Sequence, residues 1–287
     1  MIVITDKPGR LGNRLVIFAH FMALSLEYGP RFAYPTFDEY APYFTLTADD
    51  LFVRFPSKRS WLRPHPAITR ILAGVVDFIT KVIFRIGRVP RSVNLVRADP
   101  VNVTNLGEPA FVDRVVSARL TLVRGWLLRC EDLVAKHATR IRNELTPVKR
   151  HRDAIDALMA GMRDGCETLI GVHIRHGDYR TFHGGRWYFG LDQYRSVMSR
   201  AASLVPGPVR YLICSDGSHD TGEFAPLDVV EGSGHAVEDM YALARCDYLL
   251  GPPSTFTHWA SFYGEVPLYV IDDPDKAFNE SDFSIHT

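Results

Sequence analysis

Residues 169–179 limit the possible folds of this chain more than any other stretch. The first four, Leu-Ile-Gly-Val, are apolar and show no alternation of apolar and polar side chains. Such a run is typical of a strand that is buried on both faces, as in a parallel sheet covered by helices. Polar and charged residues follow at once, from His173 to Asp178. Because ligands of open α/β sheets bind just beyond the carboxyl ends of strands, we expect a site at this position.

The polar cluster has the composition of an anion site. In an extended chain His173 and Arg175 point to the same side, because side chains alternate along a strand. A guanidinium can donate two parallel hydrogen bonds to a phosphate, and Gly177 allows backbone to approach a ligand closely. A structural ion pair between Arg175 and Asp178 explains the same residues about as well. The residues alone leave both interpretations open.

Three blocks resemble the fucosyltransferase superfamily, which includes α-1,2- and α-1,6-fucosyltransferases and protein O-fucosyltransferases. Residues 173–179, His-Ile-Arg-His-Gly-Asp-Tyr, resemble its HxRRGDY motif, with His176 where the α-1,2 enzymes usually have a second Arg. Residues 9–13, Gly-Arg-Leu-Gly-Asn, resemble the loop that opens these domains before an apolar helix, here expected from residue 14 to 28. The resemblance implies that Asn13 reaches the active site.

The third block spans residues 238–264. Asp239, the pair Cys246-Asp247 and the triplet Ser254-Thr255-Phe256 match the family in register. The resemblance implies that Asp239 holds a guanine and that Ser254 and Thr255 hold phosphates. A helix N-cap explains the hydroxyl pair equally simply. The family also has a Ser-Asp pair where Ser215-Asp216 follows a predicted strand, and a turn or cap is the alternative there.

The resemblance implies a GT-B-like α/β fold, with two Rossmann-like domains facing a cleft. We place an acceptor-side domain at residues 1–150 and a nucleotide-sugar-binding domain at 151–287. The implied reaction is an inverting, metal-independent transfer of L-fucose from GDP-fucose, a donor substrate rather than a cofactor, to a glycan or glycoconjugate hydroxyl. The predicted catalytic residues are Arg175, Asn13 and Asp178. The predicted donor-binding residues are Gly12, Asn13, His173, Arg175, Ser215, Asp216, Asp239, Ser254, Thr255 and Phe256.

Two alternatives remain at this stage. A GT-B transferase for another nucleotide sugar would share the cleft but should lack the first and third blocks. A non-catalytic relative that binds a sugar nucleotide or glycan would keep the fold, and His176 in place of Arg is compatible with it. Turnover separates this relative from an enzyme.

The charge and cysteine content of the chain limit the kinds of partner that it can bind. The 33 basic and 33 acidic residues give a formal net charge of zero, so nothing global favours nucleic acid. The four cysteines lack metal-ligand spacing, and no secretory signal precedes the first apolar run. We expect a cytoplasmic enzyme of the bacterial type, active in polysaccharide biosynthesis.

Two segments allow more than one interpretation. Residues 57–94 carry an apolar stripe at helical spacing with many basic residues and a single acid, Asp77. We favour a helix whose stripe faces the core, with a peripheral membrane contact as the alternative. The aromatic-rich residues 34–55 could shape an acceptor pocket, although packing explains most of the rings. Residues 111–116 are predicted to form a strand, and residues 131–145 one helix.

Overall fold

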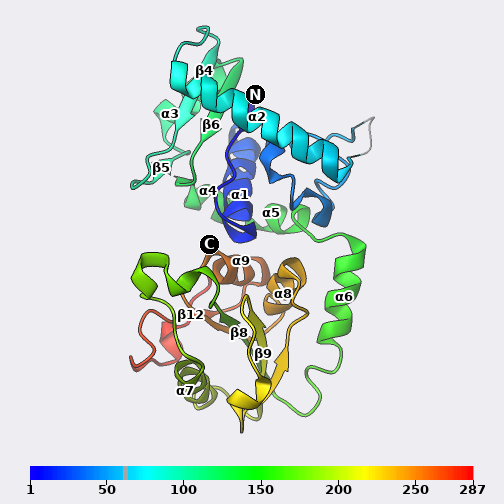
Figure 1. The fold of residues 1–287 in the computed structure, drawn as a ribbon, viewed down its shortest axis with the longest axis vertical. Helices are drawn as coiled ribbons and strands as arrows, with labels where there is room; N and C mark the ends of the chain where they lie inside the picture. Colours follow the sequence, from blue (N-terminus) through cyan, green and yellow to red (C-terminus); the bar gives the residue numbers. More distant parts are fainter. Residues whose placement is uncertain (61–63, 287) are drawn as a thin grey trace. The chain divides into compact units, whose positions relative to one another are not determined.

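The computed structural model describes residues 1–60 and 64–286. Within these ranges the chain forms two compact units, Met1–Val148 and Lys149–Thr287, each built on its own five-stranded sheet (Figure 1). The second unit begins in the basic segment at residues 149–152.

The first unit has the strand order β3-β2-β1-β6-β4. All pairs are parallel except β2 with β3. The strands are β1 (Ile2–Ile4), β2 (Phe32–Ala33), β3 (Arg54–Phe55), β4 (Val93–Arg97) and β6 (Leu120–Arg124), beside a separate pair β5 (Thr104–Asn105) and β7 (Leu128–Arg129). The helices are α1 (Leu11–Tyr28), α2 (Pro66–Ile86), α3 (Pro109–Ser117), α4 (Glu131–Lys136) and α5 (Ala138–Glu144).

The core of the first unit is aromatic. Phe18 of α1 packs edge-on against Phe32 and Phe37, with ring centroids 5.2 and 5.3 Å apart. Tyr34, Phe37 and Phe44 are fully buried. These rings of the 34–55 segment therefore serve packing, as favoured from the sequence, and are not available to an acceptor.

Three local predictions for the first unit were wrong in detail. Helix α1 begins at Leu11 instead of residue 14, so Gly12 and Asn13 lie in its first turn and not in the preceding loop. Residues 111–116 lie in helix α3, whose buried residues Phe111, Val112 and Val115 share one helical face. The predicted helix at 131–145 is interrupted at His137 and forms α4 and α5.

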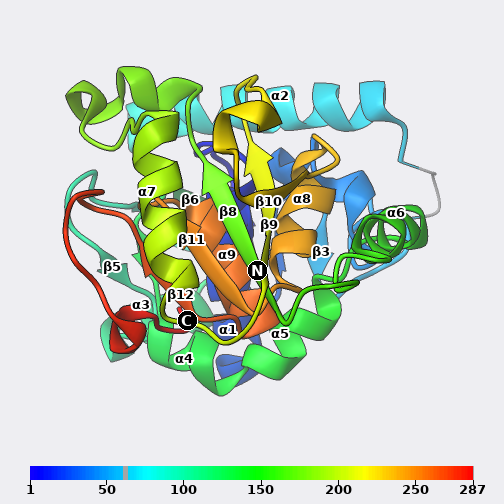
Figure 2. The same cartoon turned by 90° about the horizontal axis from the view of Figure 1, so that it is seen from below.

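The second unit is a wholly parallel sheet with the order β10-β9-β8-β11-β12. Its strands are β8 (Thr168–Ile174), β9 (Val209–Ser215), β10 (Asp228–Glu231), β11 (Tyr248–Gly251) and β12 (Leu268–Val270). Its helices are α6 (Lys149–Met159), α7 (Leu191–Ala202), α8 (Ala236–Leu243) and α9 (Thr255–Gly264). Figure 2 shows α7 on one side of β8 and α8 on the other. All seven residues of β8 are buried, which confirms the prediction of a doubly covered strand.

Gly171 explains how α8 packs so closely on β8. A Cβ atom at this position would lie 2.6 Å from a methyl of Leu243 in α8 and 3.0 Å from the sulfur of Cys246. Cys214 and Cys246 are buried free thiols, as expected for small core residues. Among the described residues, every helix is too short or too polar to span a lipid bilayer.

Candidate functional site

Arg175 lies directly after β8, the central strand of the second sheet. One terminal nitrogen, Nη2, lies 2.8 Å from Asp178 Oδ1, and the other, Nη1, lies 2.9 Å from Asp216 Oδ2. Its Nε is buried and has no hydrogen-bond partner among the described residues. The guanidinium, 13% exposed, is thus oriented by two carboxylates at the carboxyl edge of the sheet. The structural ion pair that the sequence left open is present, and it has a second carboxylate.

Asp216, at the end of β9, organises the loop that carries the motif. Its Oδ1 accepts hydrogen bonds from the backbone N–H groups of His176 (2.8 Å) and Gly177 (2.9 Å). A Cβ atom at residue 177 would lie 2.6 Å from Asp216 Oδ2, so glycine is needed for this approach. Burial raises the pKa of Asp216, but the bond from Gly177 and the charge of Arg175 outweigh it and leave the pKa below its usual value.

Ser215 and His176 also make local contacts. The Ser215 hydroxyl accepts a hydrogen bond from Gly217 N at 3.0 Å, which fits the turn that the sequence offered as an alternative. His176 Nε2 lies 2.7 Å from the carbonyl oxygen of Phe189, so this nitrogen carries a proton and donates. The imidazole that stands in place of the second Arg of the motif thus holds the loop near residue 189.

His173 is a buried neutral side chain. Its ring stacks on Phe256 of α9, with centroids 4.5 Å apart. Burial, followed by the charge of Arg175, lowers the pKa of His173 to about 3. Its Nδ1 has no hydrogen-bond partner among the described residues. The structure therefore brings together the first and third motif blocks at the ends of β8 and β11.

Helix α9 begins at the same edge. Ser254 is its N-cap, and the Ser254 hydroxyl accepts a hydrogen bond from Phe256 N at 3.2 Å. The preceding carbonyl, that of Pro253, accepts a hydrogen bond from the Tyr179 hydroxyl, which ties the two blocks together. Thr255 is the first helical residue. The amides of the first turn give this edge of the sheet a partial positive charge.

Asp239 and Ser215 line a cavity of about 260 Å³ at the ends of β9 and β10. The carboxylate is 4% exposed, and its Oδ1 accepts hydrogen bonds from Ser233 N (2.7 Å) and Ser233 Oγ (3.2 Å). Burial raises the pKa of Asp239 above its usual value. A Cβ atom at residue 232 would lie 2.6 Å from Asp239 Oδ1, so Gly232 allows the carboxylate its place.

Two residues that line this cavity were not predicted as site residues from the sequence. The His219 side chain is 7% exposed, and neither ring nitrogen makes a hydrogen bond within the described residues. Its Nε2 lies 3.5 Å from Glu231 Oε1 at the end of β10. Glu231 is the last residue of β10, so the rule that sites follow strand ends could have indicated it. His219 lies in a loop without any motif.

Among the described residues, His151, His235 and Glu238 form a cluster with metal-ligating atoms within 4.8 Å of one another. His151 Nε2 accepts from Arg150 Nε at 3.1 Å, so its Nδ1 carries the proton and donates to Glu238 Oε1 at 2.8 Å. Both nitrogens of His151 thus have protein partners, and a cation stands beside them. The donor set fits a hydrogen-bonded tie between α6 and α8 better than a metal site.

The Gly-rich block of the first unit lies between β1 and α1. Gly9 has a φ of +55°, and a Cβ atom there would overlap the Asn13 side chain, since Asn13 Nδ2 would lie only 2.1 Å away. Arg14 is buried; its Nη1 donates to Thr36 O at 3.2 Å, and its Nη2 lies 2.9 Å from Glu39 Oε2. Glycine at residue 9 thus lets the loop close over the first turn of α1.

A second arginine cluster lies at the edge of the first sheet and was missed in the sequence. Arg124, the last residue of β6, places Nη2 3.1 Å from Asp6 Oδ1 and 2.9 Å from Asp77 Oδ1. Its Nη1 donates to Thr80 Oγ1 at 3.1 Å and to Thr5 O at 3.3 Å. This cluster joins β1, β6 and α2.

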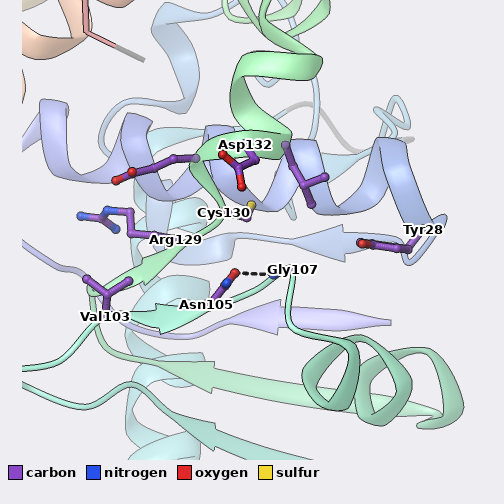
Figure 3. A pocket seen from close by; sticks show the side chains of 9 residues that line it. Tyr28, Val103, Asn105, Gly107, Arg129, Cys130 and Asp132 are labelled. Carbon is purple, nitrogen blue, oxygen red and sulfur yellow. Dashed lines mark hydrogen bonds between the residues drawn. The ribbon is translucent and has the colours of Figure 1, made fainter.

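A larger cavity, of about 500 Å³, lies in the first unit (Figure 3). Tyr28, Asn105, Arg129 and Asp132 are among its lining residues. Tyr28 ends α1, so the cavity lies about 22 Å along that helix from Asn13. None of the predicted site residues is among the described residues that line it.

Known proteins resemble this chain in fold more than in sequence. No protein-family model matches it. Nodulation protein Z of Bradyrhizobium diazoefficiens is 27% identical over a match that covers 38% of this chain and 38% of that protein. The chain thus matches well under two thirds of that relative.

Solved fucosyltransferases match nearly the whole chain. A mutant of Arabidopsis thaliana FUT1 in complex with GDP has a TM-score of 0.61 at 14% identity, covering 100% of this chain and 74% of its own. NodZ, an α-1,6-fucosyltransferase soaked with GDP-fucose, has a TM-score of 0.54 at 19% identity, covering 98% and 96%. POFUT1 in complex with GDP has a TM-score of 0.54 at 11% identity, covering 93% and 97%. The predicted fold class, α/β and GT-B-like, is confirmed.

Proposed function

We propose that this protein transfers L-fucose from GDP-fucose to a hydroxyl of a glycan or glycoconjugate, with inversion and without a metal ion. The observation that carries the proposal is the oriented Arg175 guanidinium beside the start of α9, on a sheet edge that also holds the Asp239 cavity. The similar solved structures are fucosyltransferases with GDP or GDP-fucose, which supports this choice of donor.

The order of these features fits an extended nucleoside diphosphate. The cavity with Asp239 lies at the ends of β10 and β9, Arg175 follows β8, and α9 follows β11. Neighbouring strands are about 4.8 Å apart, so the edge from the cavity to α9 measures about 12 Å. Guanine would bind in the cavity with its N–H groups donating to Asp239. The diphosphate would then bind Arg175 and the hydroxyls and amides of Ser254 and Thr255.

Breaking the bond between fucose C1 and the β-phosphate oxygen leaves negative charge on that phosphate and positive charge on the sugar ring. Arg175 would stabilise the departing GDP, while the acceptor hydroxyl attacks C1 from the opposite face and loses its proton. Asp178, 2.8 Å from Arg175 and 48% exposed, is placed to orient the guanidinium and is the first candidate for the base. Asn13 is proposed to assist Arg175 at the donor phosphate, and the first unit is proposed to serve the acceptor.

A panel of nucleotides tests the donor. GDP and GDP-fucose should raise the melting temperature more than UDP or UDP-sugars, since a ligand at 100 times its Kd stabilises by about 2.7 kcal/mol. Transfer or slow hydrolysis of GDP-fucose should persist in EDTA. A larger shift with UDP, or loss of turnover that Mg²⁺ restores, would overturn the respective part of the proposal. The motif resembles that of the α-1,2 enzymes except at His176, and product NMR would distinguish an α-1,2 linkage from the α-1,6 linkage of NodZ.

Asp239→Asn tests the base pocket through two quantities, the affinity for GDP and the stability of the free protein. It should weaken GDP binding about 10- to 100-fold, since a hydrogen bond to a charged group contributes about 1.5–3 kcal/mol. The free protein should not lose stability, because burial raises the pKa of Asp239 and thus makes the ionised form unfavourable. Wild-type GDP affinity should also fall as the pH is lowered toward this raised pKa. Calorimetry measures both, and unchanged GDP affinity in the variant would contradict the assignment.

A further inference from the structure

Helix α2 has its apolar stripe on the solvent side. Its large apolar residues recur at spacings of three and four and cover an arc about 100° wide. Phe78 is 69% exposed, Ile71 67% and Ile86 62%. The other strongly exposed members are Ile68, Val75, Ile79 and Val82. A core helix would bury this stripe, so the favoured sequence interpretation was wrong.

The opposite face explains this orientation. The buried residues of α2 are small: Thr69, Ala73 and Thr80. Arg124 donates to Thr80 Oγ1 at 3.1 Å and pairs with Asp77 Oδ1 at 2.9 Å, which fixes the rotation of the helix on the sheet. Because small and polar residues pack inward, the large apolar residues of the stripe stay 41% to 69% exposed. In Figure 1, α2 runs across the first unit as one uninterrupted helix.

Positive charge lies beside the stripe. On the helix, Arg70, Lys81 and Arg85 occupy the arc next to Phe78, by the same 100° rotation per residue. Exposed basic residues follow at Arg88 and Arg91 and precede at Lys58 and Arg59. Arg63 falls outside the described residues. The single acid between residues 51 and 98, Asp77, is already paired with Arg124 and Lys81.

We infer that α2 docks the protein on a lipid surface with anionic headgroups. A helix with an exposed apolar stripe and a basic flank lies in the plane of the interface, with the stripe among the acyl chains and the cations at headgroup level. Charge complementarity selects this occupant. In a contact with a second copy, neither basic flank would find a free acidic side chain on the other α2. The inference is independent of the proposed sugar transfer.

Vesicle sedimentation of the full chain tests this surface. Wild-type protein should bind vesicles of phosphatidylcholine with 30% phosphatidylglycerol at least tenfold more tightly than pure phosphatidylcholine, and less tightly as salt rises. Ile71→Ser/Phe78→Ser/Ile79→Ser should lower binding at least tenfold. The matched control Val101→Ser/Val116→Ser alters two residues that are 80% and 56% exposed outside α2 and should bind as the wild type does.

A further double variant separates the apolar contribution from the electrostatic one. Arg70→Gln/Arg85→Gln should weaken binding to the anionic vesicles and reduce its salt dependence, while the apolar stripe stays intact. Circular dichroism should show all variants folded, because the altered side chains are exposed. The inference is overturned if no vesicle binds the wild type or if the triple variant binds equally well. It also fails if light scattering shows a wild-type dimer that the triple variant converts to monomer.

Discussion

Each sheet carries an arginine held by two carboxylates at its carboxyl edge, and the two clusters differ in what else the guanidinium contacts. Arg124 also donates to Thr80 Oγ1 and to the backbone carbonyl of Thr5, so protein groups surround it. Arg175 has an unpartnered Nε among the described residues and stands over the Tyr179 ring, 5.4 Å from its centroid.

The carboxylates differ as well. Asp178 is 48% exposed, so a phosphate can take its place on Arg175 at little cost in desolvation. Asp77 of the Arg124 cluster is 25% exposed and belongs to the helix that the cluster holds in place. The same ion triad thus serves as a structural tie in one unit and, on our proposal, as a donor site in the other.

Among the substitutions, Arg175→Ala should have the largest effect, and this effect should be on the rate of catalysis. Loss of a preorganised donor at a developing charge typically costs about 2.7–4 kcal/mol, so kcat/KM for GDP-fucose should fall about 10²- to 10³-fold. The melting temperature should change little, because Asp216 keeps its two backbone hydrogen bonds. Arg175→Lys, which keeps the charge but loses the fork, should recover only part of the rate. Near-normal transfer by the alanine variant would contradict the role given to Arg175.

Arg124→Ala should show the reverse pattern. It leaves Asp6 and Asp77 without their shared cation and removes a hydrogen bond to Thr80, so the free energy of unfolding should fall by about 2–3 kcal/mol. Transfer by the remaining folded protein should stay within a few-fold of wild type. Urea unfolding and steady-state rates measure the two effects. A rate loss as large as that of Arg175→Ala would abolish the distinction between the clusters.

The sequence predicted the second unit better than the first because the second unit's signals are local. The apolar run at 169–172 predicted a buried strand, and Ser254 and Asp239 lie in short strand-turn-helix segments with matching motifs. Residues 111–116 were read as a strand from their Val-rich run. Pro109 in the first turn, a typical helix start, was the signal against that reading.

The missed features depend on contacts between distant residues. Asp6, Asp77 and Arg124 are separated by 47 to 118 positions and meet only in the folded sheet. The stripe of α2 was recognised, but periodicity cannot say which face of a helix meets the core. That choice was made by Thr69, Ala73 and Thr80, which are small enough to pack closely. His219 can be recognised as a site residue only from its position in the wall of the cavity.

The smallest predicted effect concerns two buried histidines, one in each unit. His20 Nδ1 accepts a hydrogen bond from Cys130 N at 2.9 Å, whereas His173 Nδ1 has no partner among the described residues. Burial, aided by a nearby arginine in each case, lowers both pKa values to about 3. Below the usual pKa of 6.5, the unfolded chain therefore binds protons that the folded chain does not. The free energy of unfolding then falls as the pH is lowered.

His173→Gln isolates one of these two contributions. At pH 5 the neutral His173 should cost about 2 kcal/mol of stability relative to pH 8, since each pH unit corresponds to about 1.4 kcal/mol. The variant should lose this part of the pH dependence and keep the part due to His20. Urea unfolding at both pH values measures the difference. An unchanged slope would mean that His173 takes up a proton in the folded state, which would contradict the lowered pKa of His173.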